Sequence, residues 1–354
     1  MSVTGFYTVG ELTQVLPNFP KSTPDLQSPS LLGGGNPADW NQSLDFSAAR
    51  MLKDLSLCGI PLYPSILGLR SLTGLRLTDR RFKLHLDTLL DFLEANHSLE
   101  SVGLGIGWTE PSLRCSWRQT PIGNQLRRLS IFCDEAADGR ALISNIPLPR
   151  GAALEIHYGY PDVTLTAMLS GVSLTHLSNL PFPTFMEYQT FPRTIRLLGP
   201  NGSFLYDGNF SEQRAFQEFP LLPLGNIRKL RLKYRKSLLS SVLRLSSFPS
   251  LEVLVIDSTE GGVPLSTALP DPTCSSLNTL AFLDCVITES FITELTQFAF
   301  RRGGPTSASL HRVVIIGSSD EHFPQASAAS IARLREHVPV VEVMEGSELS
   351  MDLL

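Results

Sequence analysis

Basic residues alternate with apolar ones in several segments, and this arrangement could bind acidic groups. The densest example is residues 227–236, Ile-Arg-Lys-Leu-Arg-Leu-Lys-Tyr-Arg-Lys. Arginine pairs with carboxylates and phosphates through two parallel hydrogen bonds, so the pattern predicts contact with an acidic or phosphorylated segment of a partner protein. The alternative is a solvated strand face whose charges only prevent edge pairing. The candidate binding residues are Arg76, Arg128, Arg196, Lys229, Arg231 and Lys233.

Residue patterns typical of catalysis are missing from the sequence. The seven histidines are dispersed, without an H-x-x-x-H or H-E-x-x-H pair, and no serine lies in a G-x-S-x-G elbow. The glycines of residues 103–107 lack nucleotide-loop spacing and predict a turn after a strand. We therefore expect no enzyme and no catalytic, cofactor-binding or metal-binding residue. The alternative from another class is a hydrolase or nucleotide enzyme in the irregular middle, residues 147–223.

A recurring apolar step, L-x-x-L-x-L, must position the basic residues. Its best copy is Leu277, Leu280 and Phe282, which has strand period and precedes apolar residues at helical spacing from Phe291 to Phe298. A strand, a turn and a helix together make one leucine-rich repeat. Clear copies begin at Leu52, Leu72, Leu99, Leu126, Ile227, Leu251, Leu277, Leu310 and Val338, and weaker ones contain Leu154, Leu174 and Ile195.

Repeat spacing predicts the fold class. Successive clear copies within each run lie 20–33 residues apart, close to the period of leucine-rich repeats. We expect an α/β fold, a leucine-rich-repeat solenoid with a mainly parallel concave sheet and helices or loops on the convex side. Residues 45–354 would form this irregular solenoid, and residues 1–44, rich in Pro, Ser, Thr and Gly, a flexible leader. Helices are expected near residues 87–93 and 327–337.

The sequence also predicts which side chains face outward. Side chains alternate along a strand, so the residues between the apolar positions of each step would lie on the concave surface. This surface would be basic in its middle and more apolar toward the C-terminal repeats, at Val255, Ala281 and Val314. Cys285 occupies the place where such repeats carry Asn or Cys, and we expect it to cap backbone groups inside the turn.

Three strings are similar to the repeat regions of the large F-box-like protein families of mushroom-type fungi. They are L-K-D-L-S-L-C-G-I-P-L (52–62), T-L-L-D-F-L-E-A-N-H-S-L-E-S-V-G-L (88–104) and I-S-N-I-P-L-P-R-G-A-A-L-E-I (143–156). The resemblance covers roughly residues 45–345 and implies a substrate-recognition subunit of a cullin ubiquitin ligase. Residues 1–45 contain no F-box, so a Skp-type adaptor is implied only if an F-box lies upstream. The alternative is a stand-alone leucine-rich-repeat scaffold with no ubiquitin link.

Composition excludes several kinds of partner. The formal net charge of −5 argues against nucleic acid, and no apolar run approaches the roughly 20 residues that span a bilayer. The five scattered cysteines are typical of reduced thiols, which predicts a protein of the cytoplasm or nucleus. We expect a protein partner, no nucleic acid, no membrane and no cofactor.

Overall fold

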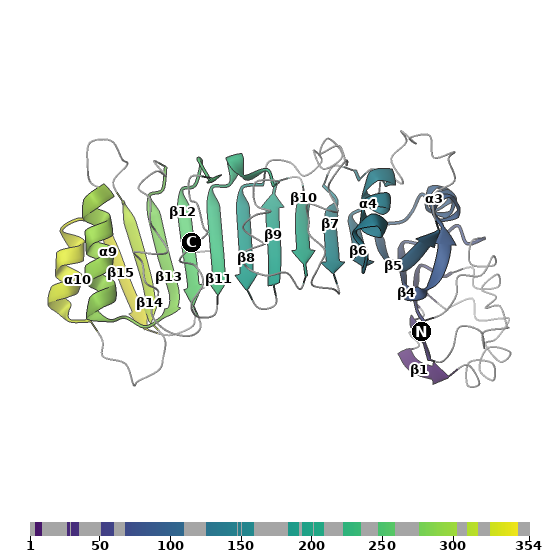
Figure 1. Cartoon of the computed structure of the whole chain (residues 1–354), viewed down its shortest axis with the longest axis horizontal. Coiled ribbons are helices and arrows are strands. Elements are labelled where there is room, and N and C mark those ends of the chain that lie inside the picture. Colours follow the sequence, from purple (N-terminus) through teal and green to yellow (C-terminus); the bar gives the residue numbers. More distant parts are fainter. Residues whose placement is uncertain are drawn as a thin grey trace. The chain divides into compact units, whose positions relative to one another are not determined.

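The structure is a computed structural model with two compact units. It describes residues 4–8, 27–28, 30–34, 51–59, 68–109, 125–146, 148–149, 151–158, 183–190, 193–200, 202–208, 222–234, 247–258, 276–302, 310–317 and 326–345. Unit 1 comprises residues 1–181 and 201–206, and unit 2 comprises residues 182–200 and 207–354. Both units are built mainly from parallel strands and contain helices, which confirms the predicted α/β class (Figure 1).

Unit 1 contains a sheet with the strand order β1-β2-β3-β4-β5-β6-β7-β10. Every registered pair from β1 to β7 is parallel. Helix α3 connects β4 to β5, and α4 connects β6 to β7. The elements are β1 (Thr4–Thr8), β2 (Ser30–Gly34), β3 (Asp54–Cys58), β4 (Gly74–His85), α3 (Leu86–Ala95), β5 (Ser101–Thr109), β6 (Arg128–Cys133), α4 (Ala136–Asn145), β7 (Ala153–Tyr158) and β10 (Gly202–Asp207).

Unit 2 contains a sheet with the strand order β9-β8-β11-β12-β13-β14-β15. Figure 1 shows α9 and α10 beside each other next to the last strands, and the ring of Phe291 on α9 meets that of Phe282 on β13 edge-on at 5.0 Å. The elements are β8 (Phe185–Thr190), β9 (Arg193–Gly199), the 3-10 helix η3 (Leu224–Asn226), β11 (Lys229–Tyr234), β12 (Val253–Ser258), β13 (Thr279–Cys285), α9 (Glu289–Arg302), β14 (Arg312–Gly317), α10 (Ala328–Arg335) and β15 (Val340–Glu345).

The apolar step forms the core face of each sheet, as predicted. Each of the nine clear copies places its second and third apolar residues in a strand, β3 to β6 in unit 1 and β11 to β15 in unit 2. In eight of these copies all three apolar residues are buried, whereas Val341 and Val343 of the last copy are half-buried. Burying one such side chain contributes about 1.5–3 kcal/mol, so the repeated step accounts for the position of the core.

Backbone bonds in front of the strands repeat with the same period. One carbonyl accepts two successive N–H groups of the next repeat: Lys53 O binds the N–H groups of Thr73 and Gly74 at 2.6 and 3.0 Å. The carbonyl oxygens of Gln27, Thr73 and Glu100 in unit 1, and of Thr184, Arg228, Glu252 and Asn278 in unit 2, do the same. This ladder fixes the register between neighbouring strands.

A serine directly before the first apolar residue supports this ladder in four copies. The hydroxyl groups of Ser71 and Ser98 donate to Leu52 O and Leu72 O, both at 3.1 Å. Those of Ser250 and Ser276 donate to Gly225 O at 2.7 Å and Pro249 O at 3.4 Å. Each serine therefore satisfies a carbonyl of the preceding repeat.

Of the four α-helices in the described residues, three were predicted and one was not. Helices α3, α9 and α10 occupy the expected segments. The hydroxyl oxygen of Thr288 accepts a hydrogen bond from the N–H of Phe291 at 3.1 Å, and that of Ser327 accepts one from the N–H of Ser330 at 3.3 Å. These are N-cap bonds, which satisfy orphan donors of the first turn. Helix α4 was missed because it has few apolar residues at helical spacing. Its buried residues are Gly139, Leu142 and Ile143. The weak copy at Leu174 lies outside the described residues.

Strand order departs from the expected chain order. In unit 2, β8 pairs with both β9 and β11, so β9 comes before β8 in the strand order although it follows β8 in the sequence. The β8–β9 pair is antiparallel, with Glu187 opposite Arg196.

Two expectations for unit 1 also need comment. Residues 103–107, expected as a turn, belong to strand β5. Strands β1 and β2 lie within residues 1–44, and the boundary between a leader and a solenoid at residue 45 stays a prediction.

The apolar residues expected on an open concave surface are buried. In unit 2, Val255, Ala281, Val314 and Ile316 form a cluster at most 4% exposed on the sheet face opposite Leu280. Half-buried Val253, Leu283 and Met344 pack against it. The expectation of an open apolar surface at these positions was wrong, because strand alternation specifies a face but not whether that face is covered.

Candidate partner-binding surfaces

One sheet face of unit 1 gathers charged and planar side chains from three strands. Alternation along β6 and β7 places these residues opposite the buried apolar step, where the register aligns Ser130 with Glu155 and Phe132 with His157. We call this set the polar face cluster; its members are Arg76 on β4, Arg128, Ser130 and Phe132 on β6, and Glu155 and His157 on β7.

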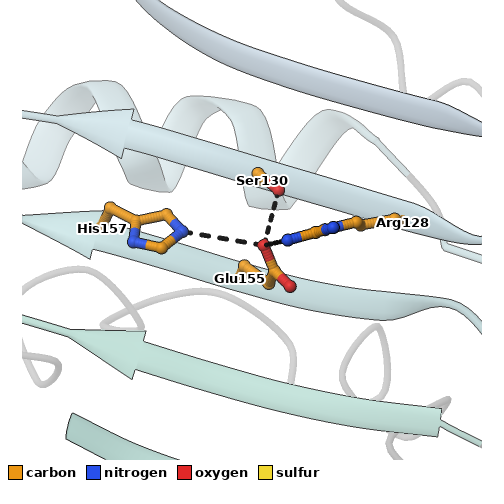
Figure 2. A network of polar contacts seen from close by, with 4 residues as sticks. All are labelled: Arg128, Ser130, Glu155 and His157. Carbon is orange, nitrogen blue, oxygen red and sulfur yellow. Dashed lines mark hydrogen bonds and ion pairs between the residues drawn. The ribbon is translucent and has the colours of Figure 1, made fainter. Parts of the chain in front are cut away.

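Glu155 is the centre of the cluster (Figure 2). Its Oε2 accepts hydrogen bonds from Arg128 Nη2 and Ser130 Oγ, both at 2.8 Å, and lies 3.7 Å from His157 Nε2. The Glu155 side chain is 14% exposed, whereas that of Arg128 is 57% exposed. Burial opposes ionisation, but the bonds from Arg128 and Ser130 and the charges of Arg128 and His157 outweigh it and lower the pKa of Glu155.

Planar side chains from β4, β6 and β7 stack on this face. The Phe132 and His157 rings are stacked at 4.6 Å with an interplanar angle of 11°, and the Arg76 guanidinium lies 5.2 Å from the Phe132 ring centre. Arg76 and Phe132 are separated by β5, so they meet only because Gly103 and Gly105 have no side chains there. A Cβ at Gly105 would lie 3.0 Å from Phe132 Cβ, and one at Gly103 3.3 Å from Arg76 Cγ.

The lowered pKa of Glu155 predicts a pH dependence of unit 1. A carboxyl whose folded pKa is depressed stabilises the fold above its unfolded value, about 4.3, and this contribution is lost as the pH falls through the folded value. Glu155→Gln should therefore cost about 1 kcal/mol at pH 7, the scale of a hydrogen bond to a partly solvated charge, and progressively less below pH 4. Tryptophan fluorescence during urea unfolding measures this, because all three tryptophans belong to unit 1.

Glu100→Gln is the matched control for this measurement. Glu100 also faces an arginine, but its carboxylate is 3.8 Å from Arg127 Nε and 46% exposed, so the pair is largely screened by water. We expect its substitution to change the unfolding midpoint little at either pH. A difference between wild type and Glu155→Gln that grows toward acidic pH would contradict the assigned direction.

In unit 2 two of the basic candidates, Arg231 and Lys233, are neutralised by carboxylates of neighbouring strands. Arg231 Nη2 lies 2.5 Å from Asp257 Oδ2, with both side chains less than 15% exposed. Lys233 Nζ lies 3.1 Å from Glu187 Oε1, and the Glu187 side chain is 12% exposed. Removing one partner from a poorly solvated pair leaves an uncompensated charge, so these cations serve the fold first.

The remaining candidates have different surroundings. Lys229 Nζ lies 5.8 Å from the Phe185 ring centre, and exposed Arg196 is opposite Glu187 in the β8–β9 register. Arg76 and Arg128 belong to unit 1 and the other four candidates to unit 2. The structure therefore brings the six predicted residues together as two separate groups, one in each unit.

Sequence reasoning missed the carboxylates and rings that complete both groups. Aligning the step of β7 with that of β6 would have placed Glu155 opposite Ser130, and aligning β11 with β12 would have placed Asp257 opposite Lys233. The position of Glu187 could not be found in this way, because its strand, β8, pairs with β11, which is not the next strand in the sequence.

Cys285 has a structural role, as expected. It is 1% exposed, and its Sγ lies 3.7 Å from Ile316 O, toward which the thiol donates. Burial raises the pKa of the Cys285 thiol to about 12, so it stays protonated at neutral pH and is a poor nucleophile.

The described part of the chain offers no metal cluster, since no group of three or more His, Cys, Asp or Glu side chains converges there. Within the same residues, no helix is both long and apolar enough to cross a membrane. No protein-family model matches the chain, and a search of curated proteins finds no relative.

Proposed function

We propose that this chain is a non-enzymatic protein-binding module whose polar face cluster binds an acidic or phosphorylated segment of a partner protein. The proposal rests on one observation: the side chains of Arg76 and Arg128 are exposed beside the stacked rings of Phe132 and His157. Arginine and aromatic residues are enriched among those that dominate binding energy at protein interfaces.

Charge supports an acidic partner. The cluster carries Arg76 and Arg128 against a single carboxylate, Glu155, and His157 adds a further positive charge when it is protonated. Glu155 engages Arg128 through one Nη2 bond, and the largely exposed Arg128 side chain can offer its other N–H groups to a ligand. Glu155 thus orients Arg128, and Phe132 orients Arg76, before a partner arrives, which lowers the entropic cost of binding.

At the level of the whole protein, the repeated strands are successive units of a leucine-rich-repeat solenoid. The period of the apolar step and the carbonyl ladder of both units support this assignment. The F-box-like resemblance then implies that the bound protein is the substrate of a ubiquitin ligase, in the cytoplasm or nucleus. Co-purification of the native protein with a Skp-type adaptor would support this role, whereas a stand-alone scaffold would bind its partner without the adaptor.

A peptide selection tests the binding function. The full chain is used to select from a library of random peptides, half of them phosphorylated, and the affinity of recovered peptides is measured by fluorescence anisotropy. We expect enrichment of Asp, Glu or phosphorylated residues, and at least about a tenfold loss of affinity, about 1.4 kcal/mol, on Arg128→Ala.

Arg127→Ala is the matched control. Arg127 directly precedes Arg128 and its side chain is 80% exposed, but it faces Glu100 and is not a member of the polar face cluster. General electrostatic attraction would make the two substitutions equivalent. Equal losses for Arg127→Ala and Arg128→Ala, or peptides without acidic enrichment, would overturn the assignment.

A further inference from the structure

A second surface of unit 2 leaves an aromatic side chain in water. Helix α9 buries Phe291, Ile292, Leu295 and Ala299, but Phe300 is 67% exposed. Among the described residues, Met51 is the other large hydrophobic side chain that remains exposed. Phe300 lines a pocket of about 510 Å³ between the last turns of α9 and the end of α10, together with Thr296, Gln297, Arg301 and His337.

Packing holds this pocket in place. The rings of Phe300 and His337 meet edge-on, with centres 5.5 Å apart, and the His337 N–H donates to Leu334 O at 3.0 Å. The last turn of α9 is anchored because Arg302 is fully buried and its Nη2 donates to Leu277 O at 2.9 Å. The pocket is therefore preformed rather than part of a fraying helix end, which lowers the cost of ligand binding.

Charge around the pocket is mainly positive. Exposed Arg301 and His337 line it, and none of its lining residues is acidic. The acidic residues of α9 lie in its first two turns, where the Glu289 carboxylate accepts bonds from Ser327 and Ser330 and Glu294 lies near Ser290. A ligand at the Phe300 end therefore meets Arg301 and His337 and no acidic lining residue.

We propose that this pocket docks a partner protein segment in which a large apolar side chain is flanked by carboxylates. The apolar side chain packs on the exposed face of Phe300 and displaces water from the pocket, which is the favourable apolar contribution. A flanking carboxylate pairs with Arg301, which supplies the directional contact. The site is distinct from the polar face cluster, since its residues belong to unit 2 and it requires an apolar anchor.

Competitive selection tests this docking site in the full chain. Random short peptides displayed on phage are selected on the wild-type protein after depletion on Phe300→Ala. Enrichment of Leu, Phe or Trp next to Asp or Glu is the expected result. A recovered peptide should bind Phe300→Ala and Arg301→Glu at least about tenfold more weakly than wild type, and replacing its carboxylates with lysines should restore binding to Arg301→Glu.

Met51→Ala and Arg128→Ala are the controls. Met51 tests for nonspecific attachment to exposed apolar side chains, and Arg128 separates this site from the proposed function, so neither change should alter the affinity. Equal binding to wild type and Phe300→Ala, or recovered peptides without acidic residues, would overturn the proposal. Sedimentation that shows a wild-type dimer dispersed by Phe300→Ala would overturn it in favour of self-association.

Discussion

Replacing Leu280 with alanine should destabilise unit 2 by about 2–5 kcal/mol, the range for truncating a buried leucine. Leu280 is 0% exposed on β13, and its register neighbours Leu254 and Val313 are equally buried on the core face. The substitution removes apolar burial and leaves a cavity between two strands and the helix layer. Hydrogen exchange followed by mass spectrometry measures the effect, as faster exchange of the β12 to β14 amides.

The neighbouring substitution Thr279→Ala provides the control. Thr279 is half-buried on the opposite face, and its hydroxyl donates at 2.7 Å to Oδ1 of the preceding residue, Asn278. Losing this local bond should cost less than about 1 kcal/mol. Unit 1 amides should exchange at wild-type rates in both variants. Comparable effects of Leu280→Ala and Thr279→Ala would mean that the core does not lie on the leucine side of β13.

Introducing lysine at Ala281 should destabilise unit 2 by about 3 kcal/mol or more, from overpacking and from the loss of water around the ammonium group. Ala281 is 0% exposed, between Val255 and Val314 on the face opposite Leu280. An open concave surface would instead accept this lysine at a cost within about 0.5 kcal/mol. Urea unfolding followed by far-ultraviolet circular dichroism distinguishes the two outcomes.

Thr279→Lys is the control for the added charge. From this half-buried position a lysine can extend its ammonium group into water while its methylenes lie along the sheet. We expect a clearly smaller effect than at Ala281. If Ala281→Lys unfolds at the wild-type urea concentration, the apolar cluster around Val255 and Val314 is open to solvent and the burial assigned to it is wrong.

The repeat strands could be predicted because their signal is local. Within six residues, each copy of the apolar step shows that a strand is present and which of its side chains face the core. A single copy, Leu52, Leu55 and Leu57, is enough to place β3. Strand direction could not be predicted, since alternation reads the same in both directions. Ile195 and Leu197 are therefore buried as expected, although their strand, β9, runs antiparallel to β8.

The candidate sites were only half predictable for a related reason. The cations were visible as residue types, but their surroundings depend on which strands become neighbours. Asp257 lies 26 positions beyond Arg231, and Glu155 lies 27 positions beyond Arg128. Register between consecutive repeats specifies those pairs, whereas coverage of Ala281 depends on tertiary structure that no local pattern encodes.

A double-mutant cycle between Arg128 and one carboxylate of a selected peptide tests the central claim most directly. The affinity is measured for wild type and Arg128→Ala, each with the acidic peptide and with its Glu→Gln or Asp→Asn form. Direct pairing predicts a coupling energy of at least about 1 kcal/mol, as close charge pairs at interfaces show. The same cycle with Arg127→Ala should give a value near zero. Absent coupling at Arg128, or equal coupling at both arginines, would contradict binding through the polar face cluster.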